Sequence, residues 1–172
     1  LKNHESNIKP FVLHVVRKRL ERWKFASLGL PLGHAVARAH RRLLEICGKV
    51  KPAVQAVYIK TLLNGWSTDR RMREMLGYVP NGRCVLCNTA ADSIEHIVHC
   101  NVTKQVFAKY GFRCRNIIDF LALDRASYPA QTPLKTKCIA IIYLMRNMIV
   151  YGHGDIDVQA TLRAACRSIM QE

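Results

Sequence analysis

Four side chains of the types that bind metals constrain the fold more than any other feature. Cys84 and Cys87 are separated by two residues, eight residues follow, and then come His96 and Cys100, which are separated by three. A Cys-x2-Cys turn directs two thiolates at one point, and residues four apart lie on one face of a helix. Three thiolates and one imidazole form a ligand set of structural zinc, with no position left open for catalysis. We therefore predict a Zn²⁺ site at these four residues.

Two alternatives concern this site. The cysteines could be ordinary buried thiols in a reducing compartment, or His99 could replace His96 as the fourth ligand. His99 directly precedes Cys100, and neighbouring residues project about 100° apart on a helix, so His96 is the better partner. Asp92 followed by Glu95 resembles a capping box, which predicts that a helix begins there. A metal would hold the polar turn to this helix in a segment too short to bury its own core.

The rest of the chain has the pattern of helices. Apolar residues recur at intervals of three and four, and Gly or Pro separates these stretches. We therefore predict an all-α protein, a helical bundle with a small zinc-stapled turn and helix in the middle. Helices are expected from about Pro10, over 34–47, from Pro52 to Leu62, after Ser67 or Thr68, and over 101–110, 117–123, 134–151 and 158–170. In the helix over 34–47, the residues expected to face inward are Val36, Ala39, Leu43, Leu44 and Cys47.

The expected domain organisation has three regions. They are a basic helical region (1–79), the CCHC segment (80–107), and C-terminal helices (108–172) that pack with the first region as one domain. The helix over 134–151 is the most apolar and is expected at the centre of the core. Lys135, Lys137 and Arg146 leave its apolar run shorter than the ~20 residues that a bilayer span requires, so we predict no membrane span.

The charge of the chain is strongly positive and unevenly distributed. It carries 27 Lys and Arg against 12 Asp and Glu, a net charge of +15. Residues 1–83 hold 17 of the basic and 5 of the acidic residues, a net charge of +12. Such an excess indicates a polyanionic partner, nucleic acid before an anionic membrane surface, although any single charge could belong to a solvated helix face. The predicted nucleic-acid-binding residues form three groups: Arg17, Lys18, Arg19, Arg22 and Lys24; Arg38, Arg41 and Arg42; and Arg70, Arg71 and Arg73.

The cysteines outside the motif predict no disulfide framework. The chain has 7 cysteines, an odd number with a single closely spaced pair, which is not typical of a small secreted scaffold. Four of them are scattered and lie mostly on apolar faces. We expect these four to be buried thiols: Cys47, Cys114, Cys138 and Cys166.

RNA is the expected partner rather than duplex DNA. The sequence has no recognition-helix or homeodomain pattern. Aromatic side chains near the basic groups could stack on unpaired bases, but we favour the interpretation that they pack in the core. These aromatic residues are Trp23, Tyr58, Trp66 and Tyr78.

The central motif resembles that of a known family. The sequence LLNGWSTDRR over 62–71 precedes the CCHC motif, whose second half has the sequence DSIEH followed by Cys100. Over about 54–107, this arrangement resembles the zinc-binding region that follows the polymerase in non-LTR retrotransposon reverse transcriptases. The resemblance implies nucleic-acid binding beside a polymerase, with Cys84, Cys87, His96 and Cys100 as zinc ligands. The chain lacks the polymerase's own Asp-Asp pair, and its acidic residues are too dispersed for an endonuclease site.

We expect no catalytic activity from this chain. It has no convincing paired carboxylates, Ser-His-Asp set or glycine loop that could cradle a phosphate. The preferred hypothesis is a non-catalytic, zinc-stabilised RNA-binding protein, a structural component of a large ribonucleoprotein such as a mitochondrial ribosome, where it contacts RNA and neighbouring proteins. The cysteine pattern indicates a reducing or metal-binding context and no signal-peptide pattern opens the chain, so we expect an intracellular location. The first residue is Leu, which is consistent with a fragment, a domain of a longer polypeptide or a processed chain, so the location is mitochondrial if a transit peptide has been removed.

Two other functions remain open. One is the target- or template-binding segment of an active non-LTR retrotransposon reverse transcriptase. The other is a protein-interaction adaptor in which zinc is only a staple. Salt separates the adaptor from a nucleic-acid binder, because affinity for single strands falls steeply as salt rises, by ~0.7 log units per neutralised phosphate for each log unit of salt.

Overall fold

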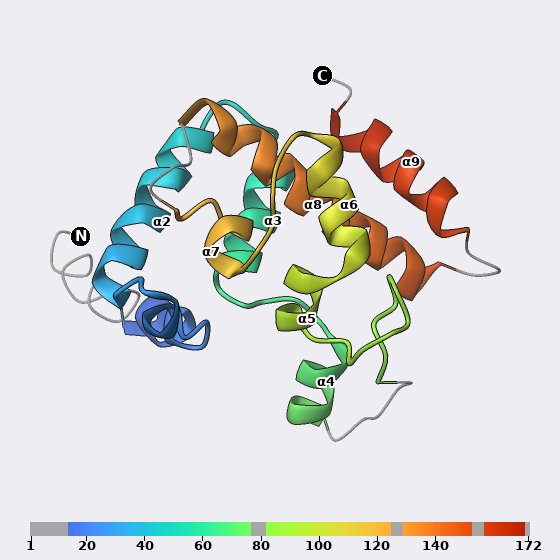
Figure 1. The fold of residues 1–172 in the computed structure, drawn as a ribbon, viewed down its shortest axis with the longest axis horizontal. Helices are drawn as coiled ribbons and strands as arrows, with labels where there is room; N and C mark the ends of the chain where they lie inside the picture. The colour runs from blue at the N-terminus through green and yellow to red at the C-terminus, as the bar shows by residue number, and fades with distance from the viewer. Residues whose placement is uncertain (1–13, 77–81, 125–128, 153–156, 171–172) are drawn as a thin grey trace, which may run out of the picture.

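The described part of the chain is helical, as predicted. A computed structural model describes residues 14–76, 82–124, 129–152 and 157–170, and in these ranges β-structure is limited to an isolated bridge between Arg83 and Ala91. Residues 14–21 are helical. The elements that follow are η1 (Phe25–Leu28), α2 (Leu32–Ile46), α3 (Pro52–Leu62), α4 (Asp69–Leu76), α5 (Ile94–His99), α6 (Asn101–Lys109), α7 (Ile117–Phe120), η2 (Pro129–Gln131), α8 (Thr132–Tyr151) and α9 (Val158–Met170) (Figure 1).

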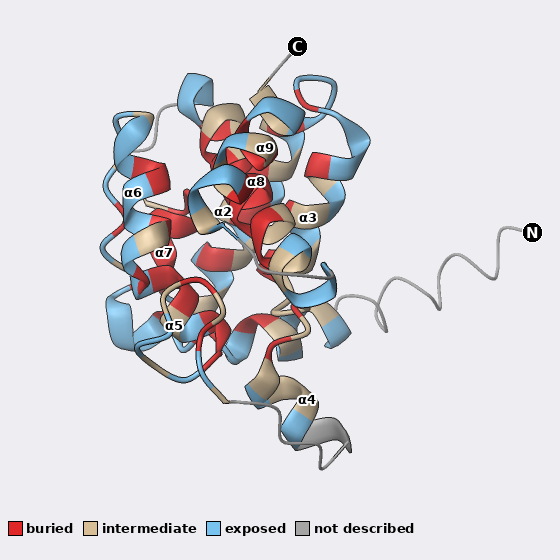
Figure 2. Cartoon of the chain, turned by 90° about the vertical axis from the view of Figure 1, so that its right-hand side faces the viewer, coloured by how far each residue is buried: buried red, intermediate tan, exposed pale blue. Residues whose placement is uncertain are grey.

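Helix α8 forms the centre of the core. It packs against α9, α3, α2 and α6, so the C-terminal part of the chain contacts both the N-terminal helices and the helix after the CCHC motif. An unbroken run over 138–142 is fully buried, and Figure 2 shows buried residues concentrated along α8 and its neighbours. Among the described helices, none combines the length and the apolar content needed to cross a bilayer.

Several helix ends lie where the sequence predicts them. Pro52 occupies the first position of α3, where its missing N–H costs nothing. The helix ends before Asn64, whose φ is +51°, and Gly65, whose amide donates to the Lys60 carbonyl at 2.7 Å. A Cβ at Gly65 would lie 2.9 Å from that carbonyl oxygen, so the close approach requires glycine. The Asp157 side chain caps the start of α9 by accepting from the Gln159 amide.

The structure corrects part of the predicted inward face of α2. Ala39 is buried, and Val36 and Leu43 are partly buried against the core, as predicted. Leu44 is 63% exposed, and Cys47 at the end of the helix is also exposed. Because Arg42 is charged, the sequence predicts that it lies on the surface of the helix. In the structure its side chain is buried, so the buried face of α2 is rotated relative to the predicted one. The residues that α2 buries are Ala35, Ala39, Arg42 and Ile46.

Buried contacts of Arg42 explain this rotation. Its Nε donates to the Ala122 carbonyl at 2.7 Å, and its Nη1 pairs with the Glu45 carboxylate at 2.6 Å. Glu45 in turn accepts a hydrogen bond from Thr132 at the start of α8. Burial opposes ionisation of Glu45, but the hydrogen bonds from Arg42 and Thr132 outweigh it and lower the pKa of the carboxyl group. These contacts join α2 to α8 and to the chain that follows α7.

Candidate metal centre and adjoining basic cleft

The first half of the CCHC motif is a tight turn held by backbone hydrogen bonds. The Cys84 amide donates to the Ala90 carbonyl at 2.6 Å, and the Asn88 amide donates to the Cys84 carbonyl at 2.7 Å. Asn88 has a φ of +55°, which lets the chain reverse directly after Cys87. The bridge between Arg83 and Ala91 closes the base of this loop. Both thiols are thereby directed toward the helix that follows.

The second half of the motif is the corner between α5 and α6. His96 lies within α5. Cys100 is both the C-cap of α5 and the N-cap of α6. The predicted start of this helix is one residue out: Ser93, rather than Asp92, is the N-cap, and its Oγ accepts from the His96 amide at 3.1 Å. The cap therefore fixes the first turn of the helix that carries the imidazole.

The four predicted ligands converge on one point. The ligand atoms of Cys84, Cys87, His96 and Cys100 all lie within 4.8 Å of one another, and Cys87 Sγ is 3.2 Å from His96 Nε2. In a tetrahedral site with Zn–S bonds of ~2.3 Å, ligand atoms are roughly 3.5–3.8 Å apart, so a small contraction would complete the coordination of one ion. The structure places His96 rather than His99 in this group: His99 is exposed and lies outside it.

The two most buried thiols of this cluster are hydrogen-bonded to each other. Cys84 and Cys100 are each 1% exposed. A hydrogen bond between the two thiols raises the pKa of Cys84 and lowers the pKa of Cys100, while burial favours the neutral form of both. A divalent cation would replace this shared proton, because metal binding requires the thiolates. All four positions are filled by protein, so the site could hold a metal ion without an open position for a reacting water.

Asp92 has a structural role that the capping pattern does not predict. Its side chain is fully buried, and Oδ2 accepts from Arg146 Nη2 at 2.6 Å and from the Asp69 amide at 2.9 Å. Arg146 also donates to the Ser67 carbonyl. The backbone of Asp92 accepts from the Arg70 amide, so the residue before the Ser93 cap holds the start of α4 as well. The CCHC segment, α4 and α8 therefore meet at one buried ion pair.

The three predicted basic groups fall in different environments. Arg42 is buried and bonded within the protein, so it is corrected from a surface contact to a structural residue. Arg38 is half-buried and donates to the Leu123 carbonyl at 2.7 Å. The exposed members of the three groups are Arg17, Lys18, Arg22, Lys24, Arg41, Arg70 and Arg73, while Arg19 and Arg71 are partly buried.

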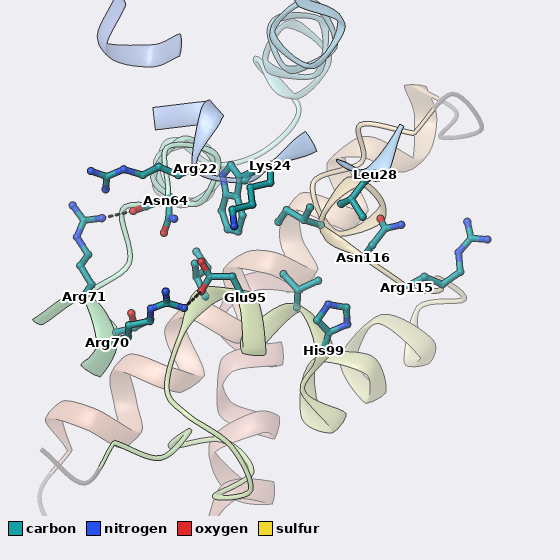
Figure 3. Close-up of a pocket in the computed structure, with 15 residues that line it drawn as sticks. Arg22, Lys24, Leu28, Asn64, Arg70, Arg71, Glu95, His99, Arg115 and Asn116 are labelled. Carbon is teal, nitrogen blue, oxygen red and sulfur yellow. Dashed lines mark hydrogen bonds and ion pairs between the residues drawn. The ribbon is translucent and has the colours of Figure 1, made fainter. Parts of the chain in front are cut away.

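Members of the first and third groups meet in one cleft of about 720 Å³. The turn before η1 contributes Arg22 and Lys24, and the start of α4 contributes Arg70 and Arg71 (Figure 3). Glu95 of α5 lies between them as the single acidic side chain of the lining. The sequence places these basic residues nearly fifty positions apart, and the fold brings them together beside the CCHC cluster.

Contacts within the cleft hold its arginines without burying them. Arg70 pairs with Glu95 at 3.8 Å, and both side chains remain more than half exposed. Arg71 donates to the Asn64 carbonyl. A water-exposed pair of this kind contributes little to stability, so a phosphate can compete with Glu95 for Arg70.

The cleft also contains residues that the sequence does not single out for this role. Arg115, His99 and Asn116 form its other end (Figure 3). Arg115 is anchored by Asp119 at 2.7 Å, which raises the pKa of its guanidinium. Asn116 caps α7 by accepting from two backbone amides. Of these three residues, only Asn116 has a recognisable pattern in the sequence, that of a helix cap before an apolar segment. The three residues lie close together because of tertiary packing, which no local pattern indicates.

The remaining thiols and aromatic residues divide as follows. Cys114, Cys138 and Cys166 are buried, as predicted, whereas Cys47 is exposed because α2 is rotated. The favoured core assignment of the aromatics is confirmed for Trp23, Tyr58 and Trp66, each of which is at most 5% exposed; Tyr78 lies outside the described residues. The indole of Trp23 donates to the Leu62 carbonyl, and that of Trp66 donates to Thr61 Oγ1. Of these rings, Trp23 also lines the cleft.

The fold and the site together define an all-helical protein with a CCHC cluster that could bind a metal ion. Comparison of the chain with models of known protein families, with curated proteins and with solved structures finds no match. Inferences about function therefore rest on the geometry and on the motif.

Proposed function

We propose that this chain is a non-catalytic, zinc-stabilised RNA-binding protein. In this proposal Zn²⁺ is held by Cys84, Cys87, His96 and Cys100, where it supplies a fixed cross-link and no reactive water. The observation that carries the proposal is the cleft beside this cluster, in which two distant basic groups face one cavity with a single carboxylate between them. Phosphate groups are the ligands that such a concentration of guanidinium and ammonium groups attracts.

The proposed setting is a large ribonucleoprotein such as a mitochondrial ribosome. A protein of that kind needs a basic surface and a stable core, and the chain has both. Its sequence contains no evident set of catalytic residues. The alternative is a target- or template-binding segment of a non-LTR retrotransposon reverse transcriptase, which the resemblance over about 54–107 favours. Isolation of the native chain separates the two: co-sedimentation with ribosomal particles supports the first, and a covalently linked polymerase supports the second.

Charge-removing substitutions in the cleft test the binding function. We expect the double variant Arg22→Gln, Arg70→Gln to bind a single-stranded RNA of about 12 nucleotides roughly tenfold more weakly at low salt. The slope of log affinity against log salt should become shallower by ~1.4, because two phosphate contacts of ~0.7 each are lost. Both side chains are exposed, so the fold should be retained. Fluorescence anisotropy over a salt series measures both quantities.

A matched control lowers the net charge by the same amount elsewhere. Arg163 and Arg167 are exposed on α9 and take no part in the cleft lining. The variant Arg163→Gln, Arg167→Gln should bind nearly as well as the unmodified chain. If the two double variants weaken binding equally, net charge rather than the cleft governs affinity, and the proposed interface is wrong. Binding that hardly responds to salt in the unmodified chain would instead favour the adaptor function.

A further inference from the structure

The two ends of the cleft differ in chemistry. Arg22, Arg70 and Arg71 gather at one end, beside Asn64 (Figure 3). Toward the other end, Leu28 of η1 and His99 of α5 come from opposite walls (Figure 3). Between them the lining is apolar, formed by buried residues of α5 and α7: Ile94, Val98 and Ile117. The cavity therefore has three arginines at one end. The other end combines an imidazole ring with an apolar wall, and Arg115 and Asn116 lie at its edge.

The side chains at the apolar end are accessible. Leu28 is 44% exposed, although a leucine in a helical turn could have been covered by the core. His99 is also exposed, and the metal cluster does not use it. Because both side chains line the cavity, a flat, uncharged group that enters here meets apolar and aromatic surface. Such a group would cover apolar surface that is now open to water.

The size of the cavity limits what can enter. Pockets for small organic groups have volumes of about 300–1,000 Å³, and a cavity of about 720 Å³ has room for a base with its sugar and phosphate. A duplex presents its bases already paired and stacked, so none can enter without being unpaired and extruded from the helix. An unpaired nucleotide needs no extrusion and carries both parts that the cleft matches.

We infer that the cleft binds one unpaired nucleotide of a single-stranded RNA, with its base between Leu28 and His99 and its phosphate at Arg22, Arg70 and Arg71. This inference rests on the proposed function and deepens it, because it assigns single strands rather than duplexes as the ligand. It also gives His99 a role in ligand contact as a ring surface, separate from the four clustered ligands. Asn116, whose Oδ1 is occupied by capping α7, leaves its Nδ2 to donate to an acceptor on the base.

Three probes of equal length test the inference on the full chain: a single-stranded RNA of about 12 nucleotides, the same strand with abasic sites throughout, and a blunt duplex. The unmodified chain should bind the first at least about fivefold more tightly than the second, because a stacked base adds affinity that an abasic strand cannot supply. The duplex should also bind more weakly than the single strand. Anisotropy at one fixed salt concentration keeps the phosphate contribution comparable between the two single strands. The duplex carries twice as many phosphates, so weaker binding of the duplex could not result from a lower charge.

Variants at the apolar end locate the base contact. His99→Ala should lower affinity for the base-containing strand about fivefold, with little effect on the abasic strand, and His99→Phe should retain most of the affinity because it keeps a ring. His40, an exposed histidine of α2 outside the cleft, supplies the matched control His40→Ala. Because His99 adjoins Cys100, the metal content of each variant is measured. Leu28→Ala, remote from that cluster in sequence, should weaken binding of the same strand by a smaller factor.

The outcomes separate this inference from the proposed function. Equal affinity for all three probes, together with no effect of Leu28→Ala, overturns base binding in the cleft. If Arg22→Gln, Arg70→Gln still weakens binding in that case, the cleft binds phosphate groups but no base, and the proposed function is retained. If that double variant binds like the unmodified chain, the proposed function itself fails. Should His99→Ala lose metal, the abasic comparison on the unmodified chain and the Leu28→Ala result decide the question.

Discussion

Replacing Cys100 by Ser is expected to release the metal from the CCHC cluster and to unfold the segment over 82–100. Cys100 closes α5 and opens α6, so its bond to a metal would fix the angle between the two helices. Structural zinc contributes about 10–16 kcal/mol of binding free energy in zinc-finger peptides. Loss of one thiolate should therefore lower the free energy of unfolding of this segment by several kcal/mol. Metal analysis and amide hydrogen exchange measure the two effects.

The spatial extent of the change is also predictable. Backbone amides over 82–100 should exchange faster by about a hundredfold or more. The buried run over 138–142 of α8, which precedes Arg146, should stay protected because α8 also packs against α9 and α3. Cys47→Ser is the matched control, since Cys47 is exposed and outside the group. A purified unmodified chain without metal, or a Cys100→Ser variant that keeps full protection over 82–100, would contradict a metal-stabilised segment.

The sequence predicts the CCHC cluster well because its members are close along the chain. The turn after Cys84 and the helix that carries His96 are local structures, and the spacing between them fixes which side chains can meet. The same locality explains why the helices over 52–62 and 158–170 are predicted nearly to the residue. Their caps and their proline or glycine signals lie within a few positions of the helix ends.

Tertiary contacts account for what the sequence does not predict. Arg42 lies inward because carbonyl groups some eighty residues away accept its hydrogen bonds, and no local pattern carries that information. The cleft likewise requires the turn at Lys24, the start of α4 and the start of α7 to meet. Charge patterning indicated that the basic residues gather in the first half of the chain. It could not show which of them share a surface.

The most consequential nonlocal contact is the ion pair between Asp92 and Arg146. The two residues are 54 positions apart, and their side chains are 0% and 2% exposed. The pair joins the residue before the α5 cap, the first amide of α4 and the middle of α8. The metal cluster and the basic start of α4 are therefore held on the same buried anchor. Through this anchor, the core helix α8 sets the position of Arg70 at the edge of the cleft.

Replacing Arg146 by Met is expected to destabilise the whole protein, by about 3–5 kcal/mol in the free energy of unfolding. The substitution leaves the Asp92 carboxylate buried with the Asp69 amide as its remaining donor among the contacts above, and Oδ1 already has no partner in the described structure. The loss is a large share of the 5–15 kcal/mol typical of a domain. Urea denaturation measures it, and a comparable slope between variants indicates a change in stability rather than in the denatured state.

The double variant Arg146→Met, Asp92→Asn distinguishes an uncompensated charge from lost packing. An asparagine at 92 can still accept from the Asp69 amide but carries no charge, so the double variant should recover a substantial part of the stability that Arg146→Met loses. Arg167→Met, an exposed change on α9, should have little effect. If the double variant is as unstable as Arg146→Met alone, the cost comes from the other contacts of Arg146, namely its packing and its hydrogen bond to the Ser67 carbonyl. The anchor that joins α4, the CCHC segment and α8 would then not depend on the charge of Asp92.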